Sequence, residues 1–212
     1  ESLGLFEAPL AGAHNVKNAL AAMAVAARVG VDVEMLRCAL REFAGVRRRL
    51  EVVGHARGVT VYDDFAHHPT AVRETLAAIR EFGLPGWSPG AGRLVAAFEP
   101  RSNTSRRNVF QEQYAASFDR ADLVMIPEPP MKDKIPQEER FSSVHLVEEL
   151  KRKGLSAFYF PDTTRLLEEI LRRSRPGDVV LFMSNGSFDN LPGRMLAGLG
   201  KIPLTEKGIS DS

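Results

Sequence analysis

From Val59 onward the sequence alternates short apolar runs with longer amphipathic segments, and this alternation restricts the fold more than any other feature. The apolar runs are VTVYDD, RLVAAF, DLVMIP, AFYF and DVVLFMS, and each has the length of a single strand. Parallel strands need long crossovers between them, whereas antiparallel strands can be joined by a tight turn. The pattern therefore predicts an α/β protein with a Rossmann-like, mostly parallel sheet and helices on both faces.

Five helices are predicted between and after these strands. The first begins at Pro69, because proline is favoured at the first helical position, and it places Val72 and Leu76 on one face. The others are expected at Asn108–Ala121, in HLVEELKRKG, in TTRLLEEILRRSR and, as a short helix, near Leu191.

The first part of the chain has a different character. Residues 1–45 contain two helical patterns with no strand between them: HNVKNALAAMAVAARVGV, which Gly30 ends, and DVEMLRCALREFAG, which Asp32 can cap. At Val46 the pattern becomes rich in β-formers, and Gly58 divides RLEVVGHARGVTVYDDF into a hairpin. The sequence thus predicts a purely helical segment at 1–45, followed by an α/β region at 46–212.

The charge balance excludes some classes of partner. Lys and Arg number 28 against 27 Asp and Glu, and the net charge of +1 lacks the basic excess typical of proteins that bind nucleic acid or anionic membranes. No apolar run reaches the roughly 18 residues of a membrane span, and no signal-peptide pattern opens the chain. The single cysteine, Cys38, excludes an internal disulfide. We expect a cytoplasmic protein with neither a nucleic-acid nor a membrane partner.

Three predicted strands end in unusually polar segments: DDFAHHPT, FEPRSNTSRR and SNGSFDN. In open α/β sheets ligands bind beyond the carboxyl ends of the strands, where loops lead into helix N-termini. We therefore expect the three segments to form one cleft, and we expect the chemistry of the protein there.

The segment DDFAHHPT has more than one reading. A metal site is disfavoured, because His67 and His68 point to opposite sides of an extended chain and no nearby His or Cys completes a zinc-like spacing. In one reading His68 caps the following helix while Asp63 and Asp64 are solvated acids. In the other, an aspartate at the strand end accepts hydrogen bonds from ribose hydroxyls, while an imidazole and the helix N-terminus meet phosphate. The stretch by itself leaves both open.

The remaining motifs also have plain alternatives. Arg101, Ser102 and Asn103 in FEPRSNTS make a set of donors suited to a carboxylate or phosphate, yet Ser or Asn here is also an ordinary helix cap. SNGSF is consistent with a simple turn at Gly186.

Two further stretches bear on a nucleotide. GAHNVKNA puts two asparagines on one helical face, where amides can read an adenine edge, although Asn near a helix start is usually a cap. The three arginines of VRRRL cannot all face one way, so at most two reach a ligand. Neither GxxxxGK[ST] nor GxGxxG occurs in the chain, which argues against a self-contained nucleotide hydrolase.

In combination the motifs are far more specific than they are singly. GAHNVKNALAA, FAGVRRRLE, VYDDFAHHPTAV, FEPRSNT and MSNGSF, in this order and at these separations, resemble the C-terminal part of the Mur ligases, the ATP-dependent amide-forming enzymes of peptidoglycan synthesis. The resemblance runs from about Gly12 to Leu199. DDFAHHPT is similar to the branch that acts on UDP-N-acetylmuramate. FEPRSNT with SNGSF is similar to the members that attach a recycled tripeptide rather than L-alanine.

The resemblance implies a three-domain ligase, with residues 1–45 as the last helices of the central ATP-binding domain and 46–212 as the C-terminal domain. The chain begins ESLGLF, without Met, and the uridine-binding domain and phosphate loop are expected upstream. In the implied reaction, ATP phosphorylates the lactyl carboxylate of UDP-N-acetylmuramate, and the amine of L-alanyl-γ-D-glutamyl-meso-diaminopimelate attacks the acyl phosphate. ATP and Mg²⁺ would be bound mainly by the missing central domain, so this piece alone is expected to be inactive.

The resemblance also implies residues for the two substrates. Toward ATP it places Asn15 and Asn18 at the adenine, Arg49 at the phosphates, Asp64 at the ribose and His67 on the phosphate side. Since the peptide carries several carboxylates, we expect it on two loops, formed by Arg101, Ser102 and Asn103 and by Asn185, Gly186 and Ser187. No catalytic residue and no metal ligand is assigned to this chain.

Two alternatives stay open from the sequence. One is the UDP-N-acetylmuramate:L-alanine ligase of the same family; the other is a non-catalytic module in which Asp63 and Asp64 hold magnesium. The module leaves FEPRSNT, SNGSF and GAHNVKNA unexplained. Ser187 and Asp189 depart from the family, whose members tend to have glycine at these positions, so the backbone of this loop is not predicted.

Overall fold

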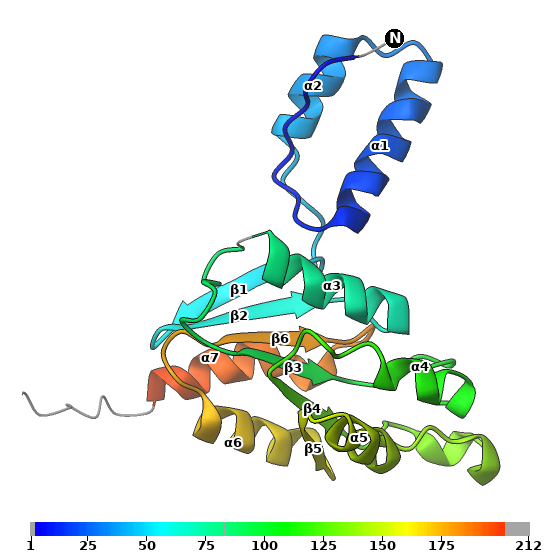
Figure 1. Cartoon of the computed structure of the whole chain (residues 1–212), viewed down its shortest axis with the longest axis vertical. Coiled ribbons are helices and arrows are strands. Elements are labelled where there is room, and N and C mark those ends of the chain that lie inside the picture. Colours follow the sequence, from blue (N-terminus) through cyan, green and yellow to red (C-terminus); the bar gives the residue numbers. More distant parts are fainter. Residues whose placement is uncertain (1–2, 83, 202–212) are drawn as a thin grey trace, which may run out of the picture.

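The computed structural model describes residues 3–82 and 84–201, and within them the chain has two parts (Figure 1). Two helices, α1 (Ala13–Arg28) and α2 (Val33–Arg41), form a hairpin that projects from a body built on one sheet. The predicted cap of the second helix is confirmed, because the Asp32 carboxylate accepts hydrogen bonds from the first amides of α2. We use "hairpin" for residues 13–41 and "body" for residues 51–201.

The predicted sheet is confirmed. Its six strands lie in the order β1-β2-β6-β3-β4-β5, and every neighbouring pair is parallel except β1–β2. These two strands form the antiparallel β-ribbon that was predicted around Gly58. The central strands are buried at every position, as expected for a parallel sheet covered on both faces. The strands are β1 (Glu51–Ala56), β2 (Val59–Asp64), β3 (Leu94–Phe98), β4 (Leu123–Pro127), β5 (Ser156–Phe160) and β6 (Val179–Met183).

Helices cover both faces of the sheet, each over its own buried apolar cluster. One cluster joins the sheet to α3, α4 and α5, and the other joins it to α6 and α7. The helices are α3 (Pro69–Glu81), α4 (Gln111–Ala115), α5 (Ser143–Arg152), α6 (Thr163–Arg173) and α7 (Leu191–Lys201), with 3₁₀ turns at Asn108–Phe110, Lys132–Lys134, Gln137–Glu139 and Phe188–Asn190. The fold class predicted from the alternation is therefore the one observed.

One predicted helix is wrong in extent. The expected helix Asn108–Ala121 is a 3₁₀ turn followed by only five residues of α4. Tyr114, Phe118 and Ala121 are all buried, so their helical spacing does report an inward face. Just after the helix ends, the Ser117 hydroxyl donates to the carbonyl of Gln113 at 2.8 Å. At the C-terminal end, α7 is longer than the short helix expected near Leu191.

The hairpin and the body differ in burial. No residue of α1 is buried, whereas the body contains both apolar clusters. The assignment of 1–45 to a different domain stays a prediction, and the range 46–212 includes residues 202–212, which lie outside the described part of the chain. None of the helices in that described part combines the length and the apolar character needed to span a membrane.

Candidate functional site

The three polar segments lie side by side, because β6 pairs with β2 on one side and with β3 on the other. Backbone hydrogen bonds continue past the strands: the Ser184 amide donates to the carbonyl of Asp64, and the Glu99 amide donates to that of Met183. The three segments DDFAHHPT, FEPRSNT and SNGSF therefore meet at one edge of the sheet, although only the first of them contributes residues to the pocket described below. We call this row of strand ends the carboxyl edge.

A pocket of about 740 Å³ opens between the hairpin and the body, a volume within the usual range of small-molecule sites. Four of the five residues that the sequence predicted for ATP line it: Asn15, Asn18, Arg49 and Asp64. The fifth, His67, is not among the lining residues, and His68 lies there instead. Alanines of α1 and apolar residues of α2 form the opposite wall, so the pocket joins a mostly apolar surface to a few polar groups.

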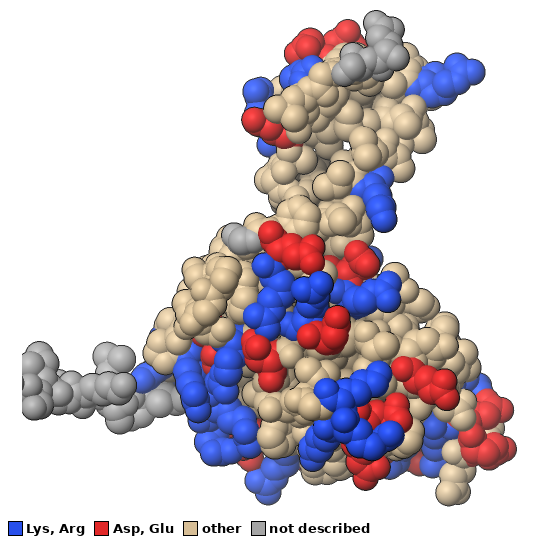
Figure 2. All heavy atoms as spheres, in the orientation of Figure 1, with Lys and Arg blue, Asp and Glu red and all other residues tan. Residues whose placement is uncertain are grey.

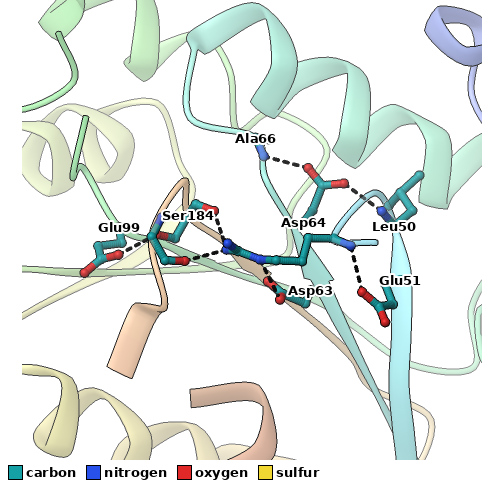
Figure 3. Close-up of polar contacts among 9 residues, drawn as sticks. Leu50, Glu51, Asp63, Asp64, Ala66, Glu99 and Ser184 are labelled. Carbon is teal, nitrogen blue, oxygen red and sulfur yellow. Dashed lines mark hydrogen bonds and ion pairs between the residues drawn. The ribbon is translucent and has the colours of Figure 1, made fainter. Parts of the chain in front are cut away.

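Asp64 is buried at the bottom of this arrangement, with 3% of its surface exposed. One carboxylate oxygen accepts from the amide of Leu50 at 2.7 Å, and the other accepts from the amide of Ala66 at 2.7 Å (Figure 3). Burial raises the pKa of Asp64, and the two amides lower it by less. Asp64 therefore connects the end of β2 to the segment that leads back to the hairpin.

The two histidines are used locally. The ring of His67 lies 2.9 Å from the carbonyl of Phe65 through Nδ1. His68 Nδ1 accepts from the amide of Thr70 at the start of α3, so the reading of His68 as a helix cap is confirmed. On the hairpin side, the Asn15 amide donates to the carbonyl of Ala11 at 2.7 Å, and the exposed Asn18 lies one turn further along α1.

At the other end of the carboxyl edge, Glu99 is a buried carboxylate shared by two loops. It accepts a hydrogen bond from the Ser184 hydroxyl after β6 (Figure 3). It also lies 3.5 Å from the Arg101 guanidinium after β3. Ser184 Oγ in turn accepts from the Gly186 amide at 2.9 Å. The loops that follow β3 and β6 are thus held together by one carboxylate.

Gly186 lies under the side chain of Arg101, so a larger residue there would displace Arg101. A Cβ there would lie 2.2 Å from Cδ and Nε of Arg101, which is far inside van der Waals contact. Arg101 therefore lies directly over the backbone of the neighbouring loop, and about a third of its side-chain surface is exposed to solvent.

The other residues predicted for the peptide have varied surroundings. Ser102 Oγ accepts from the Ser105 amide at 3.0 Å, and Asn103 accepts from Arg106 at 2.6 Å. Both bonds lie within a turn, and the next helical element begins only at Asn108 without a side-chain cap, so the helix-cap alternative is wrong. Asn185 is half-buried and its Oδ1 has no hydrogen-bond partner among the described residues. Ser187 is exposed.

Ser187 and Asp189, at positions where members of the resembled family tend to have glycine, differ in backbone conformation. Ser187 has φ −72°, which any residue adopts, so serine costs nothing in backbone conformation there. Asp189 has φ 53°, a left-handed conformation that favours glycine. Its carboxylate accepts from the Thr163 hydroxyl at 2.8 Å and also contacts Arg194, which holds this backbone in place.

Two organising residues were not among the predicted site residues. Glu99 was quoted only as part of a polar strand end, and Arg48 only as one of three arginines. Nothing in the local pattern shows that Glu99 is buried or which arginine faces which way, since both depend on how β6 inserts between β2 and β3.

The contacts of Asp63 and Asp64 are relevant to the alternative in which these two acids hold magnesium in a non-catalytic module. Its carboxylate pairs with Arg48 at 3.0 Å, and burial raises its pKa while Arg48 lowers it by less. With Asp64 bonded to backbone amides, both acids already have protein donors, which disfavours a magnesium pair at this strand end. No group of three or more His, Cys, Asp or Glu suited to a metal occurs within residues 3–82 and 84–201.

Comparison with known proteins gives a consistent result. Residues 48–186 match the glutamate ligase domain of Mur ligases. The UDP-N-acetylmuramate–L-alanyl-γ-D-glutamyl-meso-2,6-diaminoheptandioate ligase of Escherichia coli strain K12 is 39% identical over 201 residues, which are 95% of this chain and 41% of that protein. The UDP-N-acetylmuramate–L-alanine ligase of Desulforamulus reducens is 33% identical over 88% of this chain and 38% of its own length.

A solved structure agrees with the sequence matches. The murein peptide ligase of Psychrobacter arcticus 273-4 superposes with a TM-score of 0.71 at 32% identity, covering 94% of this chain and 40% of that one. The chain thus spans about two fifths of the length of the proteins it matches.

Proposed function

The chain belongs to the Mur ligase family, and from that premise we propose that it is the C-terminal part of an ATP-dependent ligase that joins L-alanyl-γ-D-glutamyl-meso-diaminopimelate to UDP-N-acetylmuramate. The choice of this tripeptide rests on the 39% identity to the Escherichia coli tripeptide ligase, against 33% and 37% to the L-alanine ligases of Desulforamulus reducens and Thermobifida fusca. A ligase of this kind serves peptidoglycan recycling in the cytoplasm.

One observation carries the proposal: the pocket between hairpin and body and the carboxyl edge meet at β2. Asp64 faces the pocket, while its neighbour Asp63 faces the loop after β6 through Arg48. A ligase must hold a nucleotide and an amine-bearing acceptor close together, since positioning supplies much of its rate enhancement. Two adjacent polar regions on one strand end fit that requirement.

The pocket suits ATP by size and by the chemistry of its lining. Asn15 and Asn18 would face the base, Arg49 the phosphates and Asp64 the ribose, while the apolar wall of α1 and α2 excludes water from the base. When bound, ATP supplies the phosphoryl group that makes the lactyl carboxylate reactive toward an amine. The role of His67 toward the phosphates stays a prediction, since His67 is not among the residues that line the pocket.

The acceptor peptide would rest on the carboxyl edge. Arg101 offers a two-pronged partner for a peptide carboxylate, and Asn185 lies on the neighbouring loop, with a buried amide oxygen that has no partner among the described residues. Ser102, Asn103, Gly186 and Ser187 line the same two loops. The role of these residues is to bind and orient the acceptor, with magnesium and the remaining substrate held mainly by parts of the enzyme upstream of this chain.

The test is acceptor preference in the intact ligase encoded by the gene that contains this chain. With ATP, Mg²⁺ and UDP-N-acetylmuramate, ADP release and product mass are measured for the tripeptide and for L-alanine. We expect kcat/KM for the tripeptide to exceed that for L-alanine by at least about tenfold, or about 1.4 kcal/mol. Preferential use of L-alanine would instead assign the chain to the L-alanine branch, and turnover of neither acceptor would refute the ligase.

A further inference from the structure

Arg48 is the one arginine of VRRRL whose side chain is drawn into the body. Its Nε donates to Asp63 at 3.0 Å, and one terminal nitrogen donates to two carbonyls, that of Ser184 at 2.6 Å and that of Gly186 at 2.5 Å (Figure 3). It is therefore bonded to β2 and to the loop after β6 at once. We call Arg48 with Asp63, Ser184 and Gly186 the Arg48 clasp.

The backbone of Arg48 is fixed as firmly as its side chain. Its amide donates to the Glu51 carboxylate at 2.7 Å, and its carbonyl accepts from the amide of Phe65 at 2.8 Å. Arg48 and Leu50 both have positive φ, 56° and 48°, which is uncommon for residues other than glycine. Such conformations persist only where surrounding contacts determine them, and here two carboxylates hold the two amides.

The clasp acts on the loop from the side opposite to Glu99. Arg48 holds the carbonyls of Ser184 and Gly186, whereas Glu99 holds the Ser184 hydroxyl and, through it, the Gly186 amide. The loop after β6 is therefore bonded on both sides of its backbone. Asn185 lies between these two anchored residues, so its orientation depends on them.

We infer that Arg48 is a positioning residue for the acceptor: it does not touch substrate, but it holds the loop of Asn185 and Gly186 in the shape that receives the peptide. The inference rests on the proposed function. It also divides the arginine run by role, since Arg49 lines the nucleotide pocket while Arg48 turns away from it into the body.

Lysine is a poor substitute for this role. The guanidinium bonds a carboxylate with one nitrogen and two carbonyls with another, in directions set by its planar geometry. An ammonium is a point charge on a flexible stem and does not reproduce three contacts in fixed directions. Arg48→Lys should therefore restore only part of what Arg48→Gln loses.

The first measurement is hydrogen exchange on the 212-residue chain, since it needs no activity. In Arg48→Gln the Gly186 amide should exchange at least about tenfold faster than in the wild type, because its bond to Ser184 Oγ opens more often once the loop loses an anchor. Arg47→Gln removes the same charge from an exposed neighbour and should leave that rate unchanged. Unchanged Gly186 exchange in Arg48→Gln would overturn the clasp whatever the enzyme does.

The second measurement is kinetics of the intact ligase. Arg48→Gln should raise the peptide KM on the order of tenfold or more, while the KM for ATP changes less than about threefold and Arg47→Gln behaves as wild type. In an Asn185→Ala background the same substitution should add less than about threefold, because both changes act on one loop. The positioning role would be overturned if the increases in peptide KM of the two single variants multiplied in the double variant. It would also be overturned if Arg48→Gln raised the KM for ATP more than the KM for the peptide.

Failure of the proposed function looks different from failure of this inference. A wild-type enzyme that forms no amide with either acceptor refutes the function, and Gly186 exchange then still decides whether the clasp exists. An active wild-type enzyme whose Arg48→Gln variant exchanges faster but keeps its peptide KM leaves the function standing and refutes the positioning role alone.

Discussion

The hairpin and the body share one chain but bury their apolar residues very differently. In the hairpin, Val16, Leu20 and Val25 of α1 are between 48% and 66% exposed, and no residue of that helix is buried. In the body, every residue of β3, β4 and β6 is buried. The two parts also differ in surface charge: on the face shown in Figure 2, most of the hairpin is uncharged, and the body carries intermingled basic and acidic side chains.

The difference in burial suggests that the body determines the stability of the chain, whereas the hairpin contributes to ligand binding. The body has its own two cores, so its fold depends little on the hairpin. The hairpin contributes Asn15 and Asn18 to the pocket, and this makes nucleotide binding a property of both parts. Glu99, Arg101 and Ser184 of the carboxyl edge all lie in the body, so acceptor binding should tolerate changes in the hairpin.

The largest expected effect tests the contrast in stability. Leu181→Ala removes a fully buried side chain from β6 and should lower the free energy of unfolding by about 2–5 kcal/mol, because a cavity remains in the core. The same substitution at Leu20, which is 58% exposed on α1, should change it by less than about 0.5 kcal/mol. Urea unfolding of the two variants measures both values. Equal losses would show that α1 is part of the folding core.

The next effect tests whether the carboxyl edge serves the acceptor alone. In the intact ligase Arg101→Lys should weaken peptide binding by about 1.5–3 kcal/mol, since lysine loses the two-pronged contact with a carboxylate. The KM values for ATP and UDP-N-acetylmuramate should move much less. A thermal melt of the variant controls for unfolding, and a change confined to ATP would mean that this loop serves the nucleotide.

A smaller effect tests the hairpin's share of the pocket. Asn18→Ala should raise the KM for ATP by an amount equivalent to about 0.5–1.5 kcal/mol, the range of one neutral hydrogen bond, with the peptide KM unchanged. Lys17→Ala, one residue earlier on the exposed surface and outside the pocket lining, is the matched control. If both variants bind ATP as the wild type does, the hairpin takes no part in the nucleotide site.

The smallest expected effect is a change of stability with pH, caused by Asp64, which lies where the hairpin and the body meet. Burial raises the pKa of Asp64 in the folded chain above its value of about 3.9 in unfolded chains. Between the two values the folded state binds more protons, so the contribution of Asp64 to stability is greatest below the unfolded pKa and declines as pH rises through the folded pKa. The stability of the wild type relative to Asp64→Asn should therefore fall from about pH 4 upward in urea titrations. Parallel pH curves would contradict the shift.

Several features were predictable because their causes lie within a few residues. Gly58 allows the turn between β1 and β2, Asp32 caps α2, and His68 with Pro69 begins α3. The continuous apolar runs predicted buried parallel strands for a similar reason, since a strand covered on both faces has no polar side to present. The predicted helix Asn108–Ala121 was too long, because the spacing of its apolar residues reports only that they point inward. A turn can satisfy the same spacing without a helical backbone.

The amino-acid sequence by itself determined the fold class, the polar strand ends and the residue types available for a nucleotide and an acidic peptide. Only the tertiary structure decided that β6 lies between β2 and β3, that Glu99 is buried against Ser184, and that Arg48 and Arg49 face different sites. The physical reason is the range of the interactions. Turns and caps are set by neighbours in the chain, whereas the pairing of β6 with β2 and the bonds of Arg48 to the loop after β6 join segments more than a hundred residues apart.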